Sequence, residues 1–459
     1  MEKLTLGMVT EFTQGELFDG DASTPVDGFS VDTRTLKQGN LFVALKGEDT
    51  DGHRHLEAAR KAGAVAAMVL RDQVEDFKSA FPRIAVANHL KGLQITAARY
   101  RKLLPIKTVA VTGSNGKTST KELAASVLSQ KFQITKTEGN LNNHIGVPLS
   151  LLQLRAGDEL GILEIGMNHA GEIEPLVEMV RPTAGIITNV GSAHIEFFKD
   201  ESEIAREKGV LAEKVPSSGV VILNRDNMPW SDQIASRTKA KILWFGMDKS
   251  AHFRAERVML HERGSDFQLV GPESRIEINF QWPGQHQIYN ALAAAALGSW
   301  FGLNLLQIRA GLESAAPPKM RMQMVKVGDN IRVWNDAYNA NPQSMQAALA
   351  VFRAVQGKGR RIAVLGEMRE LGSFSERAHL AIGAAVARSG CDMLVTVGRD
   401  GVWMAKGALD AGMGMHQVEQ FTSAQEAGGW LKQNAKPGDV LLLKGSRGNK
   451  LETILDQWK

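Results

Sequence analysis

The chain has 459 residues, more than one hydrophobic core usually organises, which predicts two or three domains. A formal net charge of +4, without a basic tract, disfavours nucleic acid as the main partner and suits a polyanionic small substrate. One cysteine excludes an internal disulfide, and neither an apolar leader core nor an apolar run long enough to cross a bilayer is present, so a cytoplasmic protein is expected.

Residues 1–85 are predicted to form a small α/β domain. Strands are expected at residues 42–45 and 65–70, with a helix at residues 56–64 between them. The polar stretches D-T-R and K-G-E-D-T-D-G-H separate these elements, and a solvated loop is the plain interpretation of each. A helical segment over residues 89–104 then ends before Pro105 and leads into the next domain.

The stretch V-A-V-T-G-S-N-G-K-T-S-T, residues 109–120, combines a β-branched strand, a glycine turn and the start of a helix. Backbone N–H groups of such a turn and the dipole of the following helix both point at bound phosphate. Lys117 is expected to reach the β- and γ-phosphates of a nucleoside triphosphate, and the Thr118 hydroxyl is expected to hold Mg²⁺. Val111 stands where the general P-loop pattern has glycine, so this is the shorter G-x-x-G-K-T form, which disfavours generic ATPases and GTPases. The predicted phosphate-binding residues are Gly113, Ser114, Asn115, Gly116, Lys117, Thr118 and Ser119.

The central domain, residues 86–313, is predicted to continue with strands at residues 161–165, 186–190, 220–223 and 242–245. Glu164 lies near the end of the first of these strands and His194 follows the second, so both are predicted to converge on the nucleotide phosphates, with Glu164 as a Mg²⁺ ligand. Taken alone, a Glu after an apolar strand is structural about as often as functional, and a lone His is more often structural. A helical segment over residues 200–214, which contains Lys208, an antiparallel segment at 254–282 and a helix at 286–297 complete the domain.

Residues 314–459 follow a boundary at Pro317-Pro318 and alternate strands with helices. The expected strands are residues 331–334, 362–365, 393–397 and 440–443, and the expected helices are 344–355, 376–388, 424–434 and a terminal one from 450. This alternation predicts βαβ units and a parallel, Rossmann-like sheet, while the absence of G-x-G-x-x-G disfavours nicotinamide binding. Cys391 precedes an apolar run, which predicts a buried structural thiol. The fold class is therefore α/β in three domains, with a P-loop-type parallel sheet in the central one.

The run Gly139-Asn140-Leu141-Asn142-Asn143 is rich in short amide side chains. Such side chains suit turns and equally suit binding of phosphate or peptide groups. From the residues alone, the conclusion is a Mg²⁺-dependent nucleotide enzyme.

Seven motifs, in one order along the chain, resemble the Mur ligases, the ATP-dependent amide ligases of peptidoglycan precursor synthesis. They are G-S-N-G-K-T-S, G-N-L-N-N-H-I-G-V-P-L, L-E-I-G-M-N, N-V-G-S-A-H-I-E, H-Q-I-Y-N-A-L-A-A-A, N-D-A-Y-N-A-N-P-Q-S-M and K-G-S-R. V-D-T-R and F-V-A-L-K-G-E-D-T-D-G-H extend the resemblance toward the N-terminus, so it covers nearly the whole chain. D-A-Y-N-A-N-P and G-E-M-R-E-L-G are similar to the family member that adds D-alanyl-D-alanine to UDP-N-acetylmuramoyl-tripeptide.

The resemblance implies a role for each matching residue. Lys117 and Thr118 would bind the ATP phosphates and Mg²⁺, and Glu164 and His194 would hold the magnesium ions. Lys208 would carry a carbamate that supports Mg²⁺, which requires a neutral amine; a surface helix lysine is the alternative. The other implied ATP contacts are Asn290, Arg321 and Asp336. The implied substrate residues are Arg34, Lys46, Asp51 and His53 near the uridine diphosphate, Asn140, Asn142 and Asn143 in the amide-rich run, and Asn339, Asn341, Lys444 and Arg447 near the dipeptide.

The implied reaction activates the tripeptide carboxylate as an acyl phosphate, which the dipeptide amine then captures. Closure of the C-terminal domain would exclude water from this intermediate. The expected partners are UDP-N-acetylmuramoyl-tripeptide and D-alanyl-D-alanine, with no nucleic acid and no membrane span, and a monomer is expected. Three alternatives stay open: the diaminopimelate- or lysine-adding ligase, a folylpolyglutamate synthase, and a P-loop ATPase or nucleotide-binding module that is not a ligase.

Overall fold

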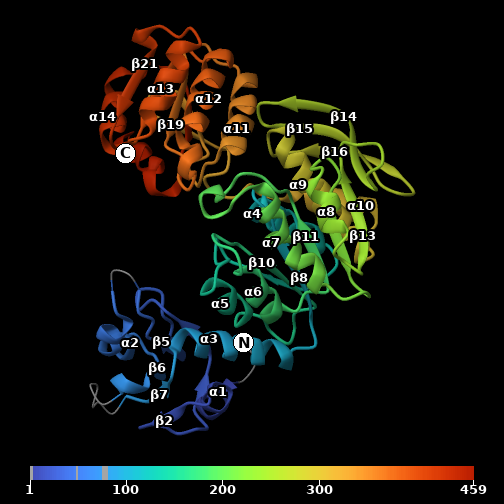
Figure 1. Cartoon of the computed structure of the whole chain (residues 1–459), viewed down its shortest axis with the longest axis vertical. Coiled ribbons are helices and arrows are strands. Elements are labelled where there is room, and N and C mark those ends of the chain that lie inside the picture. The colour runs from blue at the N-terminus through green and yellow to red at the C-terminus, as the bar shows by residue number, and fades with distance from the viewer. Residues whose placement is uncertain (1–3, 48–49, 75–80, 459) are drawn as a thin grey trace.

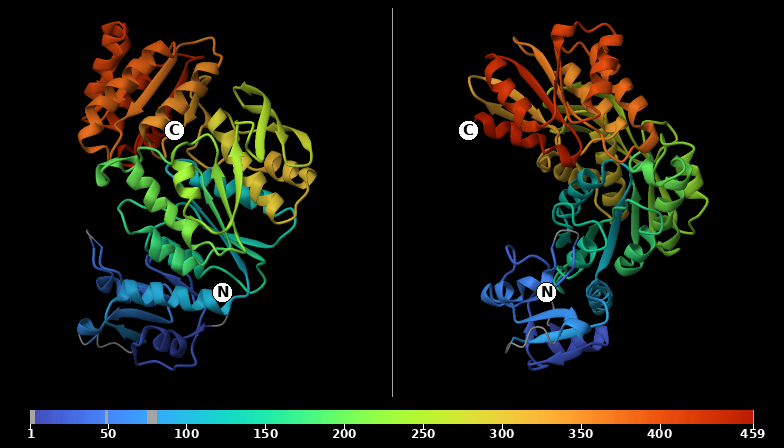
Figure 2. Two further views of the ribbon diagram at one scale, coloured as in Figure 1. Left: turned by 45° about the vertical axis from the view of Figure 1, so that its right-hand side comes forward. Right: turned by 60° about the vertical axis from the view of Figure 1, so that its left-hand side comes forward.

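The computed structural model describes residues 4–47, 50–74 and 81–458. Three α/β parts follow one another along the long axis, and the bar colours them blue, cyan to yellow, and orange to red (Figure 1). The central part lies between the other two in every view (Figures 1 and 2). The sheets are mostly parallel, which confirms the predicted α/β fold class.

The N-terminal part is built on a five-stranded sheet of order β2-β7-β6-β5-β4, in which only β2 runs antiparallel. Its strands are β2 (Glu16–Phe18), β4 (Gly28–Ser30), β5 (Asn40–Val43), β6 (Ala66–Leu70) and β7 (Arg83–Val86), beside a small pair formed by β1 (Leu4–Thr5) and β3 (Pro25–Val26). Its helices are α1 (Leu6–Thr13), η1 (Gly52–His55), α2 (Leu56–Lys61) and η2 (Arg71–Gln73), and α3 (His89–Leu103) leads into the central part. The two predicted strands and both helices are present with ends shifted by at most three residues.

The central part is built on a nine-stranded sheet of order β16-β15-β14-β13-β12-β11-β8-β10-β9. Its strands are β8 (Lys107–Thr112), β9 (Ile134–Lys136), β10 (Leu160–Glu164), β11 (Ala184–Ile187), β12 (Val220–Asn224), β13 (Lys241–Gly246), β14 (Phe253–His261), β15 (Gly264–Val270) and β16 (Arg275–Phe280). Its helices are α4 (Lys117–Leu128), α5 (Gly146–Leu151), α6 (Ile173–Val180), η4 (Ile195–Phe197), α7 (Glu201–Lys214), α8 (Trp230–Ala235), α9 (Gln285–Trp300) and α10 (Leu305–Ser314). Strands β8 to β14 pair in parallel, whereas β14, β15 and β16 pair antiparallel, which confirms the predicted antiparallel segment.

Helix α9 is buried on almost its whole circumference, since every residue from Ala291 to Leu297 is inaccessible to solvent. It contacts α4, α10 and strands β12, β13 and β14. Its run of alanines favours the helix and permits this close approach, because alanine has high helix propensity and little volume. The packing fixes the first turn of α9 beside the start of α4.

Strand β11 ends at Ile187, three residues before the predicted end at residue 190. The reason is tertiary: the backbone leaves the sheet to support the loop after β8. Ser114 N donates to Asn189 O at 2.9 Å, Asn115 N donates to Asn189 Oδ1 at 3.0 Å, and the Thr188 hydroxyl donates to Asn115 O at 2.5 Å.

The C-terminal part is built on a six-stranded sheet of order β17-β18-β22-β19-β20-β21. Its strands are β17 (Gln323–Val327), β18 (Ile331–Asn335), β19 (Arg361–Gly366), β20 (Met393–Val397), β21 (Val418–Phe421) and β22 (Val440–Lys444). Its helices are α11 (Pro342–Ala354), η5 (Gly372–Phe374), α12 (Ser375–Arg388), α13 (Gly401–Asp410), η6 (Met415–Gln417), α14 (Ala424–Asn434), η7 (Arg447–Asn449) and η8 (Leu451–Trp458).

Three elements of this part were not expected from the sequence, and a fourth has a different helix type from the one expected. The elements β17, α13 and β21 were not predicted, and β17 runs antiparallel to β18 although the other neighbours are parallel. The terminal helix expected from residue 450 is a 3₁₀ helix, η8, which starts after Lys450 adopts a left-handed φ of 50°. Cys391 is buried, as predicted, and burial raises the pKa of its thiol. None of the helices in the described residues has the length and apolar character needed to cross a membrane.

Candidate active site

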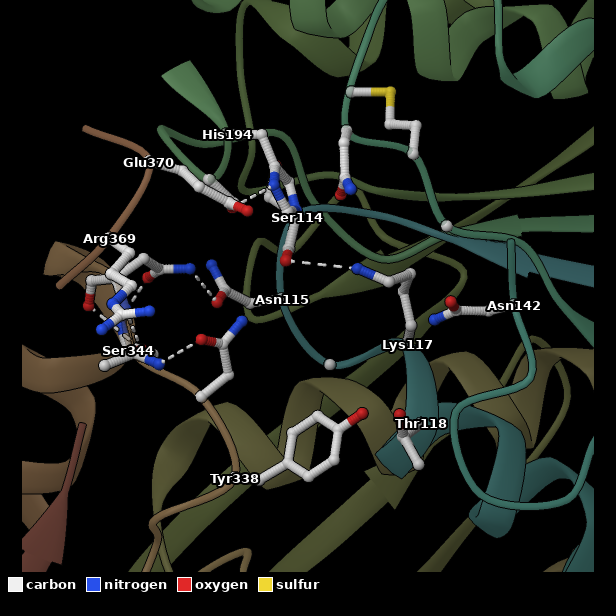
Figure 3. A pocket seen from close by; sticks show the side chains of 18 of the residues that line it. Ser114, Asn115, Lys117, Thr118, Asn142, His194, Tyr338, Ser344, Arg369 and Glu370 are labelled. Carbon is white, nitrogen blue, oxygen red and sulfur yellow. Dashed lines mark hydrogen bonds and ion pairs between the residues drawn. The ribbon is translucent and has the colours of Figure 1, made fainter. Parts of the chain in front are cut away.

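A polar cavity of about 380 Å³ lies between the central and C-terminal parts (Figure 3). The central part contributes the loop after β8 with the first turn of α4, the amide-rich run, and the loops that follow β10 and β11. The C-terminal part contributes the loops after β18, β19 and β22. Because the carboxyl ends of parallel strands gather at one edge of a sheet, residues far apart in sequence converge here.

The loop after β8 depends on two glycines for its conformation. Gly113 has a φ of 146° and Gly116 a φ of 82°, both in the region that favours glycine. A Cβ atom at Gly113 would lie 1.9 Å from Thr188 Oγ1, and one at Gly116 would lie 2.4 Å from Asn290 Oδ1. These two glycines therefore let the loop lie against Thr188 and α9. The N–H groups of Ser114 and Asn115 donate to Asn189, and the first turn of α4 lines the cavity.

Replacement of Gly116 tests this packing. Gly116→Ala is expected to lower the free energy of unfolding by about 1–3 kcal/mol, because a side chain is strained at this φ. It should also lower nucleotide affinity about tenfold, equivalent to about 1.4 kcal/mol, because the new Cβ displaces the Asn290 amide. Denaturant unfolding and titration with ADP measure the two effects. Gly157→Ala is the matched control, since a Cβ at Gly157 would meet nothing within 4 Å. Unchanged ADP affinity in Gly116→Ala would contradict the role given to this loop.

Lys117 is folded back over the loop. Its ammonium donates to Gly113 O at 2.7 Å and lies 3.5 Å from Ser114 O. Burial lowers the pKa of Lys117, while the Glu164 carboxylate opposes this shift and the Arg321 guanidinium adds to it. The ammonium is thus held over the turn at residues 113–116, and its contact with phosphate stays a prediction.

Glu164, the last residue of β10, and Thr118, in the first turn of α4, lie together. Glu164 Oε1 accepts from the Thr118 hydroxyl at 3.2 Å and from Asn142 Nδ2 at 2.7 Å. Oε2 is buried and has no hydrogen-bond partner in the described residues; the nearest cation, Lys121 Nζ, is 3.9 Å away. A buried carboxylate oxygen without a partner is costly unless a ligand completes it.

These oxygens fit a divalent cation bound together with phosphate. Mg²⁺ usually takes one or two protein oxygens and completes its shell with substrate phosphates and water. Within the described residues, no three His, Cys, Asp or Glu side chains gather closely enough to hold a metal by themselves. The Thr118 hydroxyl and the Glu164 carboxylate therefore suit a metal that arrives with its nucleotide.

Lys208 lies on α7, outside the cavity wall, and its side chain is fully buried. Burial lowers its pKa well below the usual value, the Lys117 ammonium lowers it further, and Glu207 opposes the shift. The surface-helix alternative is therefore excluded for this residue, because its side chain is inside the protein. The lowered pKa favours the neutral amine, which is the form that reacts with CO₂.

A second recess opens beside the first at the N-terminal end of α9. It is lined by Gly116, Ser119, Asn290 and His286 on one side and by Arg321, Asp336 and Lys444 on the other. Asn290 accepts from the Thr120 hydroxyl at 3.1 Å and donates to Gln287 at 2.8 Å. Burial lowers the pKa of His286 to about 4, with smaller contributions from Asp336, which raises it, and from Lys444 and Arg321, which lower it.

The C-terminal part reaches the phosphate-binding loop with charged and amide side chains. Arg321 Nη2 donates to the Thr118 hydroxyl at 3.2 Å, and its guanidinium lies 4.5 Å from the centre of the Tyr338 ring. Asn341 Nδ2 donates to Asn115 Oδ1 at 2.7 Å. The C-terminal part thus contacts the loop directly, and the cavity lies between the two parts.

Lys444 and Asp336 form a buried pair beneath this contact. Lys444 Nζ lies 2.6 Å from Asp336 Oδ2 and 3.1 Å from Asn339 O. Both side chains are mostly buried, so the Lys444 charge is already balanced within the C-terminal part.

Several predicted residues do not line either recess. Arg447 faces Glu452 at 2.5 Å, and Asn140 is exposed beside Tyr338. Asn143 lines the main cavity, and its side chain also accepts from Gly146 N at 2.9 Å. The residues predicted to bind uridine diphosphate, which are Arg34, Lys46, Asp51 and His53, lie in the N-terminal part, away from the cavity.

Within the N-terminal part, each of these four residues has a structural partner. His53 Nδ1 lies 2.6 Å from Asp51 Oδ1, and His53 Nε2 accepts from Leu70 N at 3.1 Å. Arg34 is largely exposed and pairs with Asp32 at 2.6 Å. Lys46 pairs with Asp51 through an isolated backbone bridge.

Other cavity residues were not singled out from the sequence. They include His286, Asn189, Tyr338, Gln343, Ser344, Arg369 and Glu370. All seven belong to motifs quoted for the resemblance. Arg369 and Glu370 lie in G-E-M-R-E-L-G, and the others lie in motifs of the central and C-terminal regions. The signal was therefore present in the motifs, but nothing local indicated which of their residues face the cavity.

Comparison with known proteins places the chain in a family. Models described as "Mur ligase family, catalytic domain", "Mur ligase middle domain" and "Mur ligase, glutamate ligase domain" match residues 25–104, 111–298 and 320–447. UDP-N-acetylmuramoyl-tripeptide--D-alanyl-D-alanine ligase of Bacillus subtilis (strain 168) is 35% identical, covering 99% of this chain and 98% of that protein. The chain belongs to the Mur ligase family.

Other relatives support the assignment of this chain to the Mur ligase family. The protein of the same name from Escherichia coli (strain K12) is 34% identical over 99% of this chain and 98% of its own length. A crystal structure of MurF from Acinetobacter baumannii has a TM-score of 0.88 at 30% identity and covers 100% of this Mur ligase and 99% of that chain. Folylpolyglutamate synthase of Mycobacterium tuberculosis, at 17% identity with a TM-score of 0.62, shares the fold alone and covers 78% of this chain and 92% of its own.

Proposed function

We propose that this Mur ligase adds D-alanyl-D-alanine to UDP-N-acetylmuramoyl-tripeptide, with ATP as the energy source, in peptidoglycan precursor synthesis. The observation that carries the proposal is the end-to-end similarity to relatives named for this reaction, at 34–35% identity over 99% of the chain. The polar cavity between the phosphate-binding loop and the C-terminal part supports it, because residues predicted for ATP and residues predicted for the dipeptide line it together. We also infer a cytoplasmic location, where ATP and the soluble precursor are found.

ATP is expected to lie across the two recesses. Its phosphates would lie over the loop at residues 113–116, at the N-terminus of α4 and against Lys117, and its base and ribose would lie beside Asn290 and Asp336. The Thr118 hydroxyl and the Glu164 carboxylate would hold Mg²⁺, which neutralises phosphate charge when it is bound. His194, which lines the same cavity, is the third candidate ligand.

The reaction must bring two anions together. A carboxylate oxygen of the tripeptide attacks the γ-phosphorus in line, the bond to the β,γ-bridging oxygen breaks, and ADP leaves. Lys117 and Arg321 point into the space where this charge gathers, and they would lower the repulsion between the carboxylate and ATP. The neutral amine of the dipeptide then attacks the acyl carbon, phosphate leaves, and the amine loses one proton.

The choice of amine tests the proposal directly. Purified protein with ATP, Mg²⁺ and UDP-N-acetylmuramoyl-tripeptide should release phosphate with D-alanyl-D-alanine and make a product heavier by the dipeptide less one water. L-lysine, diaminopimelate and glutamate should give at most about 1% of that rate, a discrimination of about 2.7 kcal/mol. Mass spectrometry identifies the product. Phosphate release without any amine would indicate an ATPase, and use of another amine would indicate another ligase.

A further inference from the structure

Two loops from different parts of the chain meet at the edge of the cavity, at the upper left of Figure 3. One is the turn formed by His194 and η4 in the central part, and the other follows β19 in the C-terminal part and contains Glu370. Glu196 N donates to Glu370 O at 3.2 Å. A Cβ atom on Gly372 would lie 3.3 Å from Glu196 Cγ, so the two backbones are in close contact.

The side chains of His194 and Glu370 contact each other across this boundary. His194 Nδ1 lies 2.6 Å from Glu370 Oε2, a close contact between the ring nitrogen and the carboxylate. Nδ1 is buried and has no other polar partner in the part of the chain that the structure describes. Glu370 therefore supplies the only charge that acts directly on this nitrogen.

Both residues have an uncommon backbone conformation. His194 has a φ of 63° and Glu370 a φ of 61°, a left-handed region that non-glycine residues rarely adopt. Each costs free energy that the surrounding contacts must offset, and such residues cluster at functional sites. Two of them in direct contact across a boundary indicate that both loops are arranged for this contact.

The contact determines which nitrogen of His194 is free to act in the cavity. A carboxylate beside Nδ1 favours the proton on that nitrogen, which leaves Nε2 as the lone-pair donor. Histidines that bind metal ions commonly have their other nitrogen held by a carboxylate in this way, and that partner fixes the orientation of the ring.

We propose that Glu370 is a positioning residue that prepares His194 only when the C-terminal part is docked. The proposal rests on the proposed function, since it gives His194 its place beside the ATP phosphates and Mg²⁺. Docking brings the carboxylate to Nδ1, so Nε2 is oriented after the substrates are enclosed and not before. This arrangement would couple closure to the capacity for phosphoryl transfer and limit loss of ATP in the open enzyme.

A second ion pair between the same two parts provides the matched control. Arg332 on β18 pairs with Glu262, which lies in the turn between β14 and β15 on the other side of the boundary. A carboxylate that merely holds the parts together should resemble Glu262 in its effects. A carboxylate that acts through His194 should not.

The experiment compares Glu370→Gln, Glu262→Gln, His194→Asn and the double variant His194→Asn/Glu370→Gln. Asparagine tolerates the left-handed conformation, so His194→Asn is compatible with the turn. Two quantities are measured: kcat with saturating substrates, and the Mg²⁺ concentration that half-saturates binding of β,γ-imido-ATP, a non-hydrolysable analogue. Small-angle X-ray scattering of each variant with the analogue reports whether the C-terminal part is docked.

Glu370→Gln is expected to lower kcat and raise the Mg²⁺ requirement by about 10- to 100-fold, with the KM for ATP within about threefold of the wild type. Glu262→Gln should leave the Mg²⁺ requirement within about twofold. In the His194→Asn background, Glu370→Gln should have little further effect, because the two residues act as one unit.

Three outcomes would overturn the proposal: a wild-type Mg²⁺ requirement in Glu370→Gln, an equal shift in Glu262→Gln, or full additivity of the Glu370 and His194 substitutions. The binding measurement uses neither the muramoyl substrate nor an amine. It therefore reports on Glu370 even if the amine experiment assigns a different ligase reaction.

Discussion

Lys117→Ala should reduce steady-state ADP release by about 10³-fold, because it removes the cation closest to the transferring phosphoryl group. Its ammonium is fixed within 2.7 Å of the Gly113 carbonyl, so the charge is already placed over the phosphate-binding turn. Water that fills the truncated side chain's space cannot replace a fixed positive charge, since its dipole must reorient as negative charge develops.

The loss should appear in kcat more than in protein stability. Burial of the Lys117 ammonium lowers its pKa and opposes folding of the charged form, so removing it should leave the thermal midpoint unchanged or slightly higher. Lys131→Ala is the control. Lys131 is an exposed lysine just beyond the end of α4, and its ammonium contacts the Phe301 and Gly302 carbonyls and the Phe132 ring. Near-normal ADP release from folded Lys117→Ala would remove the phosphate role from this residue.

Lys208→Ala should lose activity by about 10²-fold or more, with partial recovery on addition of acetate or another short carboxylic acid. A neutral, buried amine can combine with CO₂ to form a carbamate and release one proton, which turns the neutral side chain into an anion. The lowered pKa of Lys208, caused by burial and by Lys117, is what this chemistry requires. In the alanine variant a small carboxylate can enter the vacated space and restore the missing negative charge.

Lys214→Ala is the matched control, because Lys214 is on the same helix but pairs with Glu174 and Glu178 at the surface, at 2.6 and 2.7 Å. Rate assays with and without acetate, on variants of equal thermal midpoint, measure the rescue. Mass spectrometry under CO₂ should also detect an added mass of about 44 Da, that of one CO₂, on the wild type. Lys208→Ala should not show this addition. Full activity of Lys208→Ala without added carboxylate would remove the carbamate from the mechanism.

The sequence by itself determined the local elements around the phosphate-binding loop. A run of β-branched residues, two glycines and Lys117 with Thr118 specify strand, turn and helix through near-neighbour geometry, and the structure has β8, the loop and α4 in that order. The alternation of strands and helices after Pro318 likewise predicted the β18, β19, β20 and β22 strands, because each hydrophobic run is continuous in the sequence.

Elements whose limits depend on distant partners were predicted less well. Strand β11 ends early because Asn189 is needed by the loop around Asn115, and β17 was missed because its exposed, alternating residues resemble a loop until β18 pairs with them. Neither reason is visible within a short window of sequence.

Only the tertiary structure decided which residues act together. It placed Asn290 against Gly116 through the buried packing of α9, and it brought Arg321 and Asn341 onto the loop at residues 113–118. It also set Glu370 against His194, a pair that no sequence spacing indicates. The physical reason is the same in each case: a contact between distant segments depends on how whole sheets and helices pack, and local residue patterns do not encode that packing.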